Sequence, residues 1–307
     1  MLRARKPEAV TKRLKLFLFG PAGVGKTTAA IQFPNSYIID AERGAENYDR
    51  LITASGSSVF QTTDIHEVIQ EVKSLLTEKH DFRTLVIDPI TPLYNDLLEK
   101  CEYKVGTDFG RHYGEANKTM KRLANLIMAL DMNVVVTAHA KKEYGQNLAV
   151  LGQTFDGWRQ LDYWFDLVME LGKKGKKRFA KVVKTRVDSF PDEDVFEWSY
   201  EAIRKRYDVA MLEKEAQAMS LATGQQVQQI KELLNIVRLP DGTVEKWFAK
   251  AGVDVWEDMP ADTIQKCIEY VKNRLPTSGA AAAYTGCSPG ACGAGSEATP
   301  RALFRKG

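Results

Sequence analysis

Short apolar runs recur along the first two thirds of the chain, separated by longer stretches with helical periodicity. The runs at 14–19, 37–40, 84–88 and 133–139 have the length of single strands, and glycine, aspartate or histidine stands at the end of each. Residues 113–131 instead carry Leu and Ile along one helical face. This alternation of buried strands with amphipathic helices predicts an α/β core with a central, mainly parallel sheet flanked by helices.

The pattern changes after the core. Residues 224–275 hold three amphipathic segments, in which seven Lys and Arg stand against eight Asp and Glu. A balance this close to neutral favours a small helical module for docking or packing over a general DNA-gripping face. From Pro276 onward Gly, Ala, Ser and Pro predominate, which predicts a disordered tail. The predicted parts are a basic N-terminal arm (1–13), the core (14–200), a linker or helical connection (201–223), the three-helix module (224–275) and the tail (276–307).

The composition is that of an ordinary soluble globular protein, with 44% hydrophobic and 27% charged residues among 307. The formal charge of +3 excludes a bulk polycation, so nucleic-acid binding would depend on local basic patches. Neither a run of about 18 apolar residues nor an apolar segment behind the basic N-terminus is present, so we expect no membrane span and no secretory signal. Four cysteines are too few for a disulfide framework in a chain of this length, which favours a reducing, cytoplasmic location.

A glycine-rich loop follows the first apolar run. Residues 20–28 read GPAGVGKTT, which matches G-x-x-x-x-G-K-[ST] with a strand predicted before it and a helix after it. The glycines let the backbone N–H groups converge on the β- and γ-phosphates of a nucleoside triphosphate. Lys26 adds a mobile positive charge, and the Thr27 hydroxyl is a ligand for Mg²⁺. The predicted nucleotide-binding residues are Gly20, Pro21, Ala22, Gly23, Val24, Gly25, Lys26, Thr27 and Thr28.

Three carboxylates stand at the ends of two other predicted strands. Asp40 and Glu42 follow the second apolar run, and Asp88 ends the third. Parallel strands present their carboxyl ends at one edge of a sheet, so all three are expected near the phosphates. Asp88 is the candidate second ligand on the Mg²⁺ side, and Asp40 is a candidate nucleotide contact. Because Pro89 occupies the position after Asp88, Glu42 is the candidate general base; helix capping is the alternative for Asp40 and Glu42.

These features, in this order, resemble the RecA-type ATPase core. In that family a catalytic carboxylate ends the second strand in the same setting as I-D-A-E at 39–42. His139 ends the strand at 133–139, where the family senses the γ-phosphate and signals to a DNA-binding loop. RecA itself has an amide there, so His139 departs from the pattern, and an ordinary hydrogen-bonded histidine is the alternative.

Two predicted loops lie at the positions where the resemblance implies binding of single-stranded DNA. Residues 104–112 precede the long helix and residues 140–159 follow the sensor strand, and both mix basic side chains with glycine and aromatics. Such a mixture suits neutralisation of phosphates and stacking of bases, although other surface loops share it. The candidate DNA-binding residues are Lys104, Arg111, Lys141, Lys142, Tyr144, Trp158 and Arg159.

A basic hairpin is predicted from 166–171 and 179–187, joined by the turn GKKGKKR. Lys184 and Arg186 are two residues apart, so strand alternation places them on one face. In RecA itself a strand with paired cations reaches the ATP of the neighbouring subunit, which implies that both residues act in hydrolysis only after assembly. A solvated basic edge strand is the alternative. The cations of the turn, including Arg178, are expected in a solvated or DNA-facing patch.

A compact core followed by a small helical module resembles the phage-encoded minimal RecA-like ATPases of the Sak-type single-strand annealing group. The resemblance implies a DNA-stimulated ATPase that uses ATP and Mg²⁺ and binds single-stranded DNA as a homo-oligomer, in the cytoplasm of a bacterial host and alongside a single-strand-binding protein. A RecA-fold replicative helicase or its loader, and a signalling ATPase that binds no DNA, are the alternatives. The sequence leaves open ring or filament, annealing or strand exchange, and the adenine contacts, for which Tyr48 is only a guess.

Overall fold

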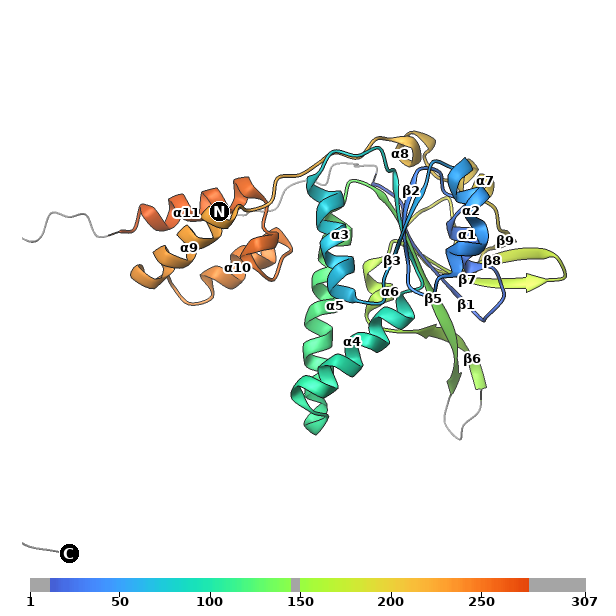
Figure 1. Ribbon diagram of the computed structural model, residues 1–307, viewed down its shortest axis with the longest axis horizontal. Helices are drawn as coiled ribbons and strands as arrows, with labels where there is room; N and C mark the ends of the chain where they lie inside the picture. The colour runs from blue at the N-terminus through green and yellow to red at the C-terminus, as the bar shows by residue number, and fades with distance from the viewer. Residues whose placement is uncertain (1–11, 145–149, 276–307) are drawn as a thin grey trace, which may run out of the picture.

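The computed structural model describes residues 12–144 and 150–275, apart from the side chains of residues 144, 150 and 151. Most of the predicted basic arm and the whole predicted tail lie outside this part. Figure 1 shows an α/β core, with its sheet between two groups of helices, and a small helical module beside it. Along the described part of the chain, no helix combines the length and the apolarity needed to cross a membrane.

A mixed sheet forms the centre of the core. Its strands run in the order β3-β2-β4-β5-β1-β7-β8-β9, and β6 pairs with the C-terminal half of β5. Neighbouring strands across the sheet from β3 through β2, β4, β5 and β1 to β7 pair in parallel. In contrast, β6 pairs antiparallel with β5, β8 with β7, and β9 with β8. The strands are β1 (Lys15–Gly20), β2 (Ser36–Asp40), β3 (Ser58–Gln61), β4 (Thr84–Asp88), β5 (Asn133–Tyr144), β6 (Val150–Asp156), β7 (Leu167–Lys174), β8 (Lys177–Thr185) and β9 (Val195–Glu197).

The register of the parallel strands brings polar residues to one edge of the sheet. Every residue of β1 and β4 is buried, as their unbroken apolar runs predict. β5 lies between these two strands, with Gly20 of β1 opposite His139 of β5. On the other side of β4, Asp40 of β2 lies opposite Asp88. The strand that leads into the glycine-rich loop therefore ends beside the strand that carries the histidine, and the strands that carry Asp88 and Asp40 come next in the sheet.

Helices cover both faces of this sheet. Phe17 packs on one face against α3, α4 and α5, whereas Leu16 and Leu18 pack on the opposite face with α1, α2, α7 and α8, because side chains alternate along a strand. The helices of the core are α1 (Lys26–Ala30), α2 (Asp49–Ala54), α3 (Ile65–Thr77), α4 (Ile90–Val105), α5 (Arg111–Ala129), α6 (Leu161–Trp164), α7 (Tyr200–Arg206) and α8 (Val209–Glu213), with the short 3-10 helices η1 (Gly44–Tyr48) and η2 (Asp108–Gly110).

The predicted fold class is confirmed, and several local predictions are wrong. The loop predicted over 140–159 is largely a second hairpin, because β5 continues to Tyr144 and pairs with β6. The loop predicted over 104–112 consists of the end of α4, η2 and the start of α5. The basic turn shortens to Gly175, with φ of 63°, and Lys176, since β7 and β8 both extend into it. In each case regular secondary structure, strands in the two hairpins and helix at 104–112, continues through residues whose composition is typical of loops.

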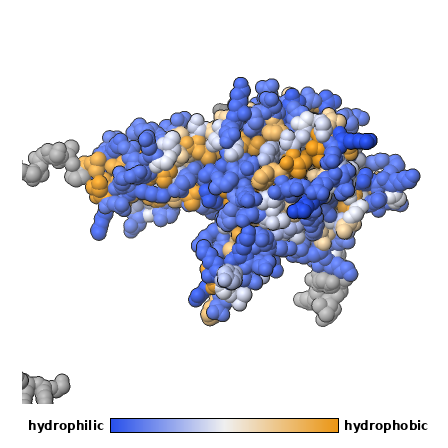
Figure 2. Space-filling model, viewed as in Figure 1, coloured by the Kyte–Doolittle hydropathy of each residue, from blue (hydrophilic) through white to orange (hydrophobic). Residues whose placement is uncertain are grey.

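The C-terminal part folds around a hydrophobic cluster of its own. It contains α9 (Gly224–Ile236), α10 (Thr243–Ala251), the 3-10 helix η4 (Trp256–Asp258) and α11 (Ala261–Lys272). Thr223 and Gln226 form a capping box that fixes the start of α9. Figure 2 shows a mainly hydrophilic face, on which hydrophobic surface gathers over this module and over the part of the core near α1 and α2.

Acidic side chains of the module contact basic side chains of the core. Asp258 is 4% exposed and accepts hydrogen bonds from Arg122 of α5 at 2.6 and 2.9 Å, with Lys73 of α3 at 2.8 Å. Burial alone would raise the pKa of Asp258, but the bonds from Arg122 and Lys73 outweigh it and hold this pKa below its usual range. Asp254 adds a bond to Lys121 at 2.8 Å. The module thus packs against basic side chains of α3 and α5, and part of its acidic charge serves to bind the core.

Candidate active site

The glycine-rich loop has the backbone that its sequence predicts. β1 ends at Gly20, where a side chain would meet the carbonyl oxygen of Leu171 at 2.5 Å. Gly23 and Gly25 have φ values of 76° and 92°, a region that residues with a side chain avoid. α1 begins immediately afterwards, at Lys26. The loop therefore curls around the start of α1, with backbone N–H groups available to a phosphate.

Lys26 bridges the two ends of this loop. Its Nζ donates to the carbonyl of Gly20 at 2.9 Å and to that of Pro21 at 3.1 Å. Burial lowers the pKa of Lys26, and the nearby charges of Asp88 and Glu42 oppose that shift. The amine therefore lies between the loop and the acidic edge of the sheet, where it can exchange carbonyl oxygens for phosphate oxygens.

Asp88 lies within hydrogen-bonding reach of two threonine hydroxyls. It is 3% exposed, and burial raises its pKa, while hydrogen bonds from Thr137 and Thr27 work in the opposite direction. Thr137, which sequence analysis did not single out, precedes His139 on β5 and donates to Oδ1 of Asp88. A hydroxyl and a carboxylate beside a phosphate loop are hard oxygen donors of the kind that Mg²⁺ prefers. Thr27 and Asp88 thus fit the predicted metal ligands.

Glu42 and His139 form a pair at the same edge. Glu42 Oε1 lies 3.0 Å from His139 Nε2, and their side chains are 45% and 39% exposed. Glu42 is also close enough to Lys26 to raise the pKa of the amine. The structure therefore brings together the carboxylate, the histidine and the lysine that the sequence analysis assigned to one site.

The role expected for Asp40 is corrected. One of its carboxylate oxygens accepts from the backbone N–H groups of Glu42 and Gly44, both at 3.1 Å, and the other accepts from that of Ala45 at 2.9 Å. Asp40 is also 2% exposed, so its carboxylate is engaged with the backbone of this turn. This is the capping alternative: Asp40 orders the turn that carries Glu42.

Two further side chains reach the loop from other elements. The Tyr48 hydroxyl lies 3.1 Å from Oγ1 of Thr28, which places this tyrosine beside the first turn of α1. Arg178 donates from Nε to the Val24 carbonyl at 3.1 Å, and its guanidinium fills the space next to Gly25. Arg178 therefore belongs to the phosphate-loop region and not to the solvated patch predicted for the turn. The sequence holds no local signal for this contact, because it depends on the pairing of β7 with β8.

Lys184 and Arg186 lie on one side of the basic hairpin, away from the phosphate loop of their own chain. Lys184 pairs in register with Val168, near the start of β7. Its Nζ donates to the carbonyls of Asp162 and Phe165, at 2.5 and 3.1 Å. Arg186 contacts Asp166 at 3.2 Å. Within one subunit these cations hold the segment around α6.

The candidate DNA-binding residues separate into exposed and buried groups. Arg111, Lys142 and Arg159 are exposed, and Lys104 is exposed at the end of α4. Lys141 is exposed but paired with Asp156 at 3.2 Å. Trp158 is only 3% exposed and packs in the main core, so little of its indole is open to a ligand. The side chain of Tyr144 lies outside the described residues.

A hydrogen-bonded path joins the β5–β6 hairpin to Glu42. Thr91, at the start of α4, donates to the carbonyl of Asp156 at 2.7 Å and accepts from the backbone N–H of His139 at 3.0 Å. Thr91 is 2% exposed, so both bonds are shielded from water. His139 continues the path to Glu42. Thr91 could not be predicted from the sequence, because a threonine in the first turn of a helix carries no specific signal.

The mainly parallel sheet and this glycine-rich loop define a P-loop nucleotide-binding core. A family profile described as an AAA domain matches residues 12–193, and the chain belongs to this family. Members of P-loop ATPase families bind a nucleotide and usually use Mg²⁺, for which Lys26, Thr27 and Asp88 are suited here.

Several solved structures are similar to the chain, although no curated protein matches it. A RadB recombinase is 19% identical, with a TM-score of 0.40 over 60% of this chain and 86% of the other. A DnaB-like replicative helicase is 13% identical, with a TM-score of 0.38 over 61% of this chain and 54% of the other. EscN, the type III secretion ATPase of enteropathogenic E. coli, is 10% identical, with a TM-score of 0.37 over 85% of this chain and 66% of the other.

Glu42→Gln should preserve the shape of the site while removing the base. We expect nucleotide to bind and turnover to fall by roughly 10²- to 10⁴-fold, the usual contribution of general acid–base catalysis. Lys26→Ala should instead weaken both nucleotide binding and hydrolysis. Phosphate release and fluorescent-nucleotide binding measure the two effects.

The matched control is Glu46→Gln, an exposed glutamate four residues along the same turn region. It should leave turnover near that of the unmodified protein. If Glu42→Gln also turned over at the unmodified rate, another carboxylate would have to be the base.

Proposed function

We propose that the protein is an ATP-dependent, single-stranded-DNA-binding recombinase or annealase of phage type, which hydrolyses ATP at the subunit interfaces of a homo-oligomer. The observation that supports this most strongly is the hydrogen-bonded path from Glu42 through His139 and Thr91 to Asp156. It connects the hydrolytic carboxylate to the hairpin that follows the sensor strand. A ligand that shifts this hairpin would thereby change the orientation of the base.

The chemistry assigned to the site uses the residues at the edge of the sheet. Lys26 and the loop N–H groups bind the β- and γ-phosphates, while Thr27 and Asp88 hold Mg²⁺, which neutralises charge that develops on the phosphates. Glu42 accepts the proton of the attacking water. His139 holds Glu42 in place, so the histidine acts as a positioning residue.

The ligand assigned to the hairpin is single-stranded DNA. Lys142 and Arg159 are exposed on or just after the hairpin, and Arg111 is exposed at the start of α5. Cations on a protruding ribbon can follow a flexible phosphate backbone without reading its sequence. A bacterial host cytoplasm and a single-strand-binding protein as partner follow from the same proposal.

Binding to single-stranded DNA should depend steeply on salt, since each phosphate neutralised contributes a slope of about −0.7 in log K against log salt. Lys142→Ala should make that slope shallower by about 0.7, the contribution of one phosphate contact, and weaken binding most at low salt. Fluorescence anisotropy of a labelled oligonucleotide across a salt series, with ATP present, measures both quantities.

Lys250→Ala is the matched control, since it removes the same charge from an exposed position on α10. It should leave the slope unchanged. Identical slopes for Lys142→Ala and the unmodified protein would remove the hairpin from the DNA interface. Absence of any DNA binding would favour the signalling ATPase, and processive unwinding under ATP would favour a helicase.

Assembly is assigned to Lys184 and Arg186. Both are remote from the phosphate loop of their own chain but adjacent on one surface, as a pair that serves a neighbouring subunit must be. Reaching that neighbour requires Lys184 to exchange the carbonyls of Asp162 and Phe165 for phosphate oxygens. The hydrolytic site would then be complete only at an interface.

Lys184→Ala chains should bind ATP but hydrolyse it on the order of 10³-fold more slowly, as loss of a cationic finger does. Mixing them with Glu42→Gln chains should restore part of the turnover, because some interfaces then combine an intact base with an intact lysine. Turnover at several mixing ratios measures this recovery. A purely local role for Lys184 predicts a lower melting temperature and no recovery at any ratio.

A further inference from the structure

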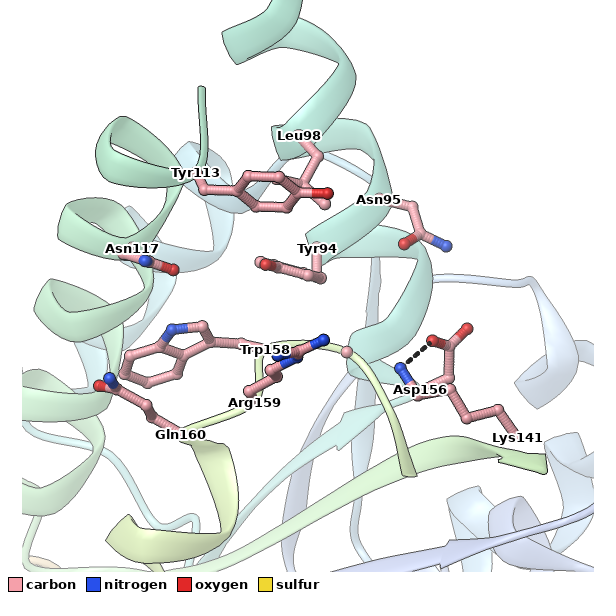
Figure 3. Close-up of a pocket in the computed structure, with 11 residues that line it drawn as sticks. Tyr94, Asn95, Leu98, Tyr113, Asn117, Lys141, Asp156, Trp158, Arg159 and Gln160 are labelled. Carbon is pink, nitrogen blue, oxygen red and sulfur yellow. Dashed lines mark hydrogen bonds and ion pairs between the residues drawn. The ribbon is translucent and has the colours of Figure 1, made fainter. Parts of the chain in front are cut away.

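A cavity of about 540 Å³ opens between α4, α5 and the segment that joins β6 to α6. Its volume lies within the range of roughly 300–1,000 Å³ that small-molecule sites occupy. Figure 3 shows Tyr94, Tyr113 and Trp158 lining it from α4, α5 and the joining segment. The cavity is separate from the phosphate loop and shares none of its residues.

Polar groups surround these rings. The carboxamides of Asn95, Asn117 and Gln160 line the cavity, and Figure 3 shows the Arg159 guanidinium between Trp158 and Asn95. Asp156 is neutralised at the rim by Lys141, at 3.2 Å. The lining is therefore aromatic, rich in groups that both donate and accept hydrogen bonds, and weakly cationic.

Three of the lining groups converge. Tyr94 is 8% exposed, and burial raises its pKa; the neighbouring Tyr113 hydroxyl adds to this shift, and Arg159 opposes it. Tyr113 is 51% exposed, so it stands at the mouth of the cavity. One tyrosine is thus fixed in the wall, and the other can close over a ligand.

We infer that this cavity binds one nucleobase of single-stranded DNA, with the base against the tyrosine rings and Arg159 directed to a flanking phosphate. The inference rests on the proposed function and names its contact site. A flat ligand with donors and acceptors along its edge matches aromatic walls and carboxamides, which are the groups that proteins use for unstacked bases. An acidic peptide fits less well, because among the described lining residues Arg159 is the one cation without a carboxylate partner.

The position of the cavity gives its occupancy a route to the ATPase site. The Thr91 hydroxyl donates its hydrogen bond to the backbone carbonyl of Asp156, whose side chain lines the cavity. Trp158 and Arg159, which also line the cavity, follow Asp156 within three residues. A base held by this segment would therefore fix the acceptor of Thr91. Contacts to backbone phosphates alone would leave that segment less constrained.

The test compares a twelve-nucleotide oligothymidylate with an abasic strand of the same length and charge, by fluorescence anisotropy with ATP present. The unmodified protein should bind the natural strand about tenfold more tightly, within the range measured for base–aromatic stacking. Tyr113→Ala should remove most of that difference while keeping the salt slope, because the phosphate contacts remain. Tyr113→Phe should retain most of it, since the ring is kept.

Tyr103→Ala is the matched control, because Tyr103 is 97% exposed on α4 and does not line the cavity. It should preserve the natural-to-abasic difference. The inference is overturned if Tyr113→Ala distinguishes the two strands as well as the unmodified protein does, or if Tyr103→Ala loses the difference equally. If the unmodified protein binds both strands equally well, the base site is wrong while the proposed function stands; if it binds neither, both fail.

Discussion

The parallel register of β1, β2, β4 and β5 is the constraint on which the candidate site depends. Because these strands pack against helices on both faces, a shift of one residue would move every side chain to the opposite face and disrupt the packing of both layers, so the register is strongly fixed. It places Gly20 opposite His139 and Asp40 opposite Asp88. The phosphate loop, the metal-side carboxylate and the candidate base therefore meet at one edge without long-range polar contacts having to position them.

The same register separates the two functions proposed for β5. Its first half is buried in the sheet and ends at His139 beside the phosphate loop, and its second half leaves the sheet core to pair with β6. Thr91 of α4 bonds to His139 of β5 and to Asp156 of β6, through two bonds shielded from water. Because such bonds are costly to leave unmade, movement of the hairpin and rotation of His139 are expected to occur together.

Strong local signals made the core and the phosphate loop predictable from the sequence. The unbroken apolar runs predicted buried strands, and GPAGVGKTT predicted the loop with its lysine and threonine. Arg178 and Thr91 could not be predicted, because their contacts depend on strand pairing and helix placement between residues far apart in the chain. The burial of Trp158 could not be predicted either, because loop composition does not reveal burial.

In the proposed function, the state of the β5–β6 hairpin controls hydrolysis at Glu42 in response to single-stranded DNA. The most direct measurement is steady-state ATP turnover with saturating ATP and Mg²⁺, with and without an oligothymidylate, for the unmodified protein and for Thr91→Val. We expect a severalfold increase in turnover with DNA for the unmodified protein and a much smaller increase for Thr91→Val. Equal turnover with and without DNA in the unmodified protein, under conditions where the strand is bound, would contradict it.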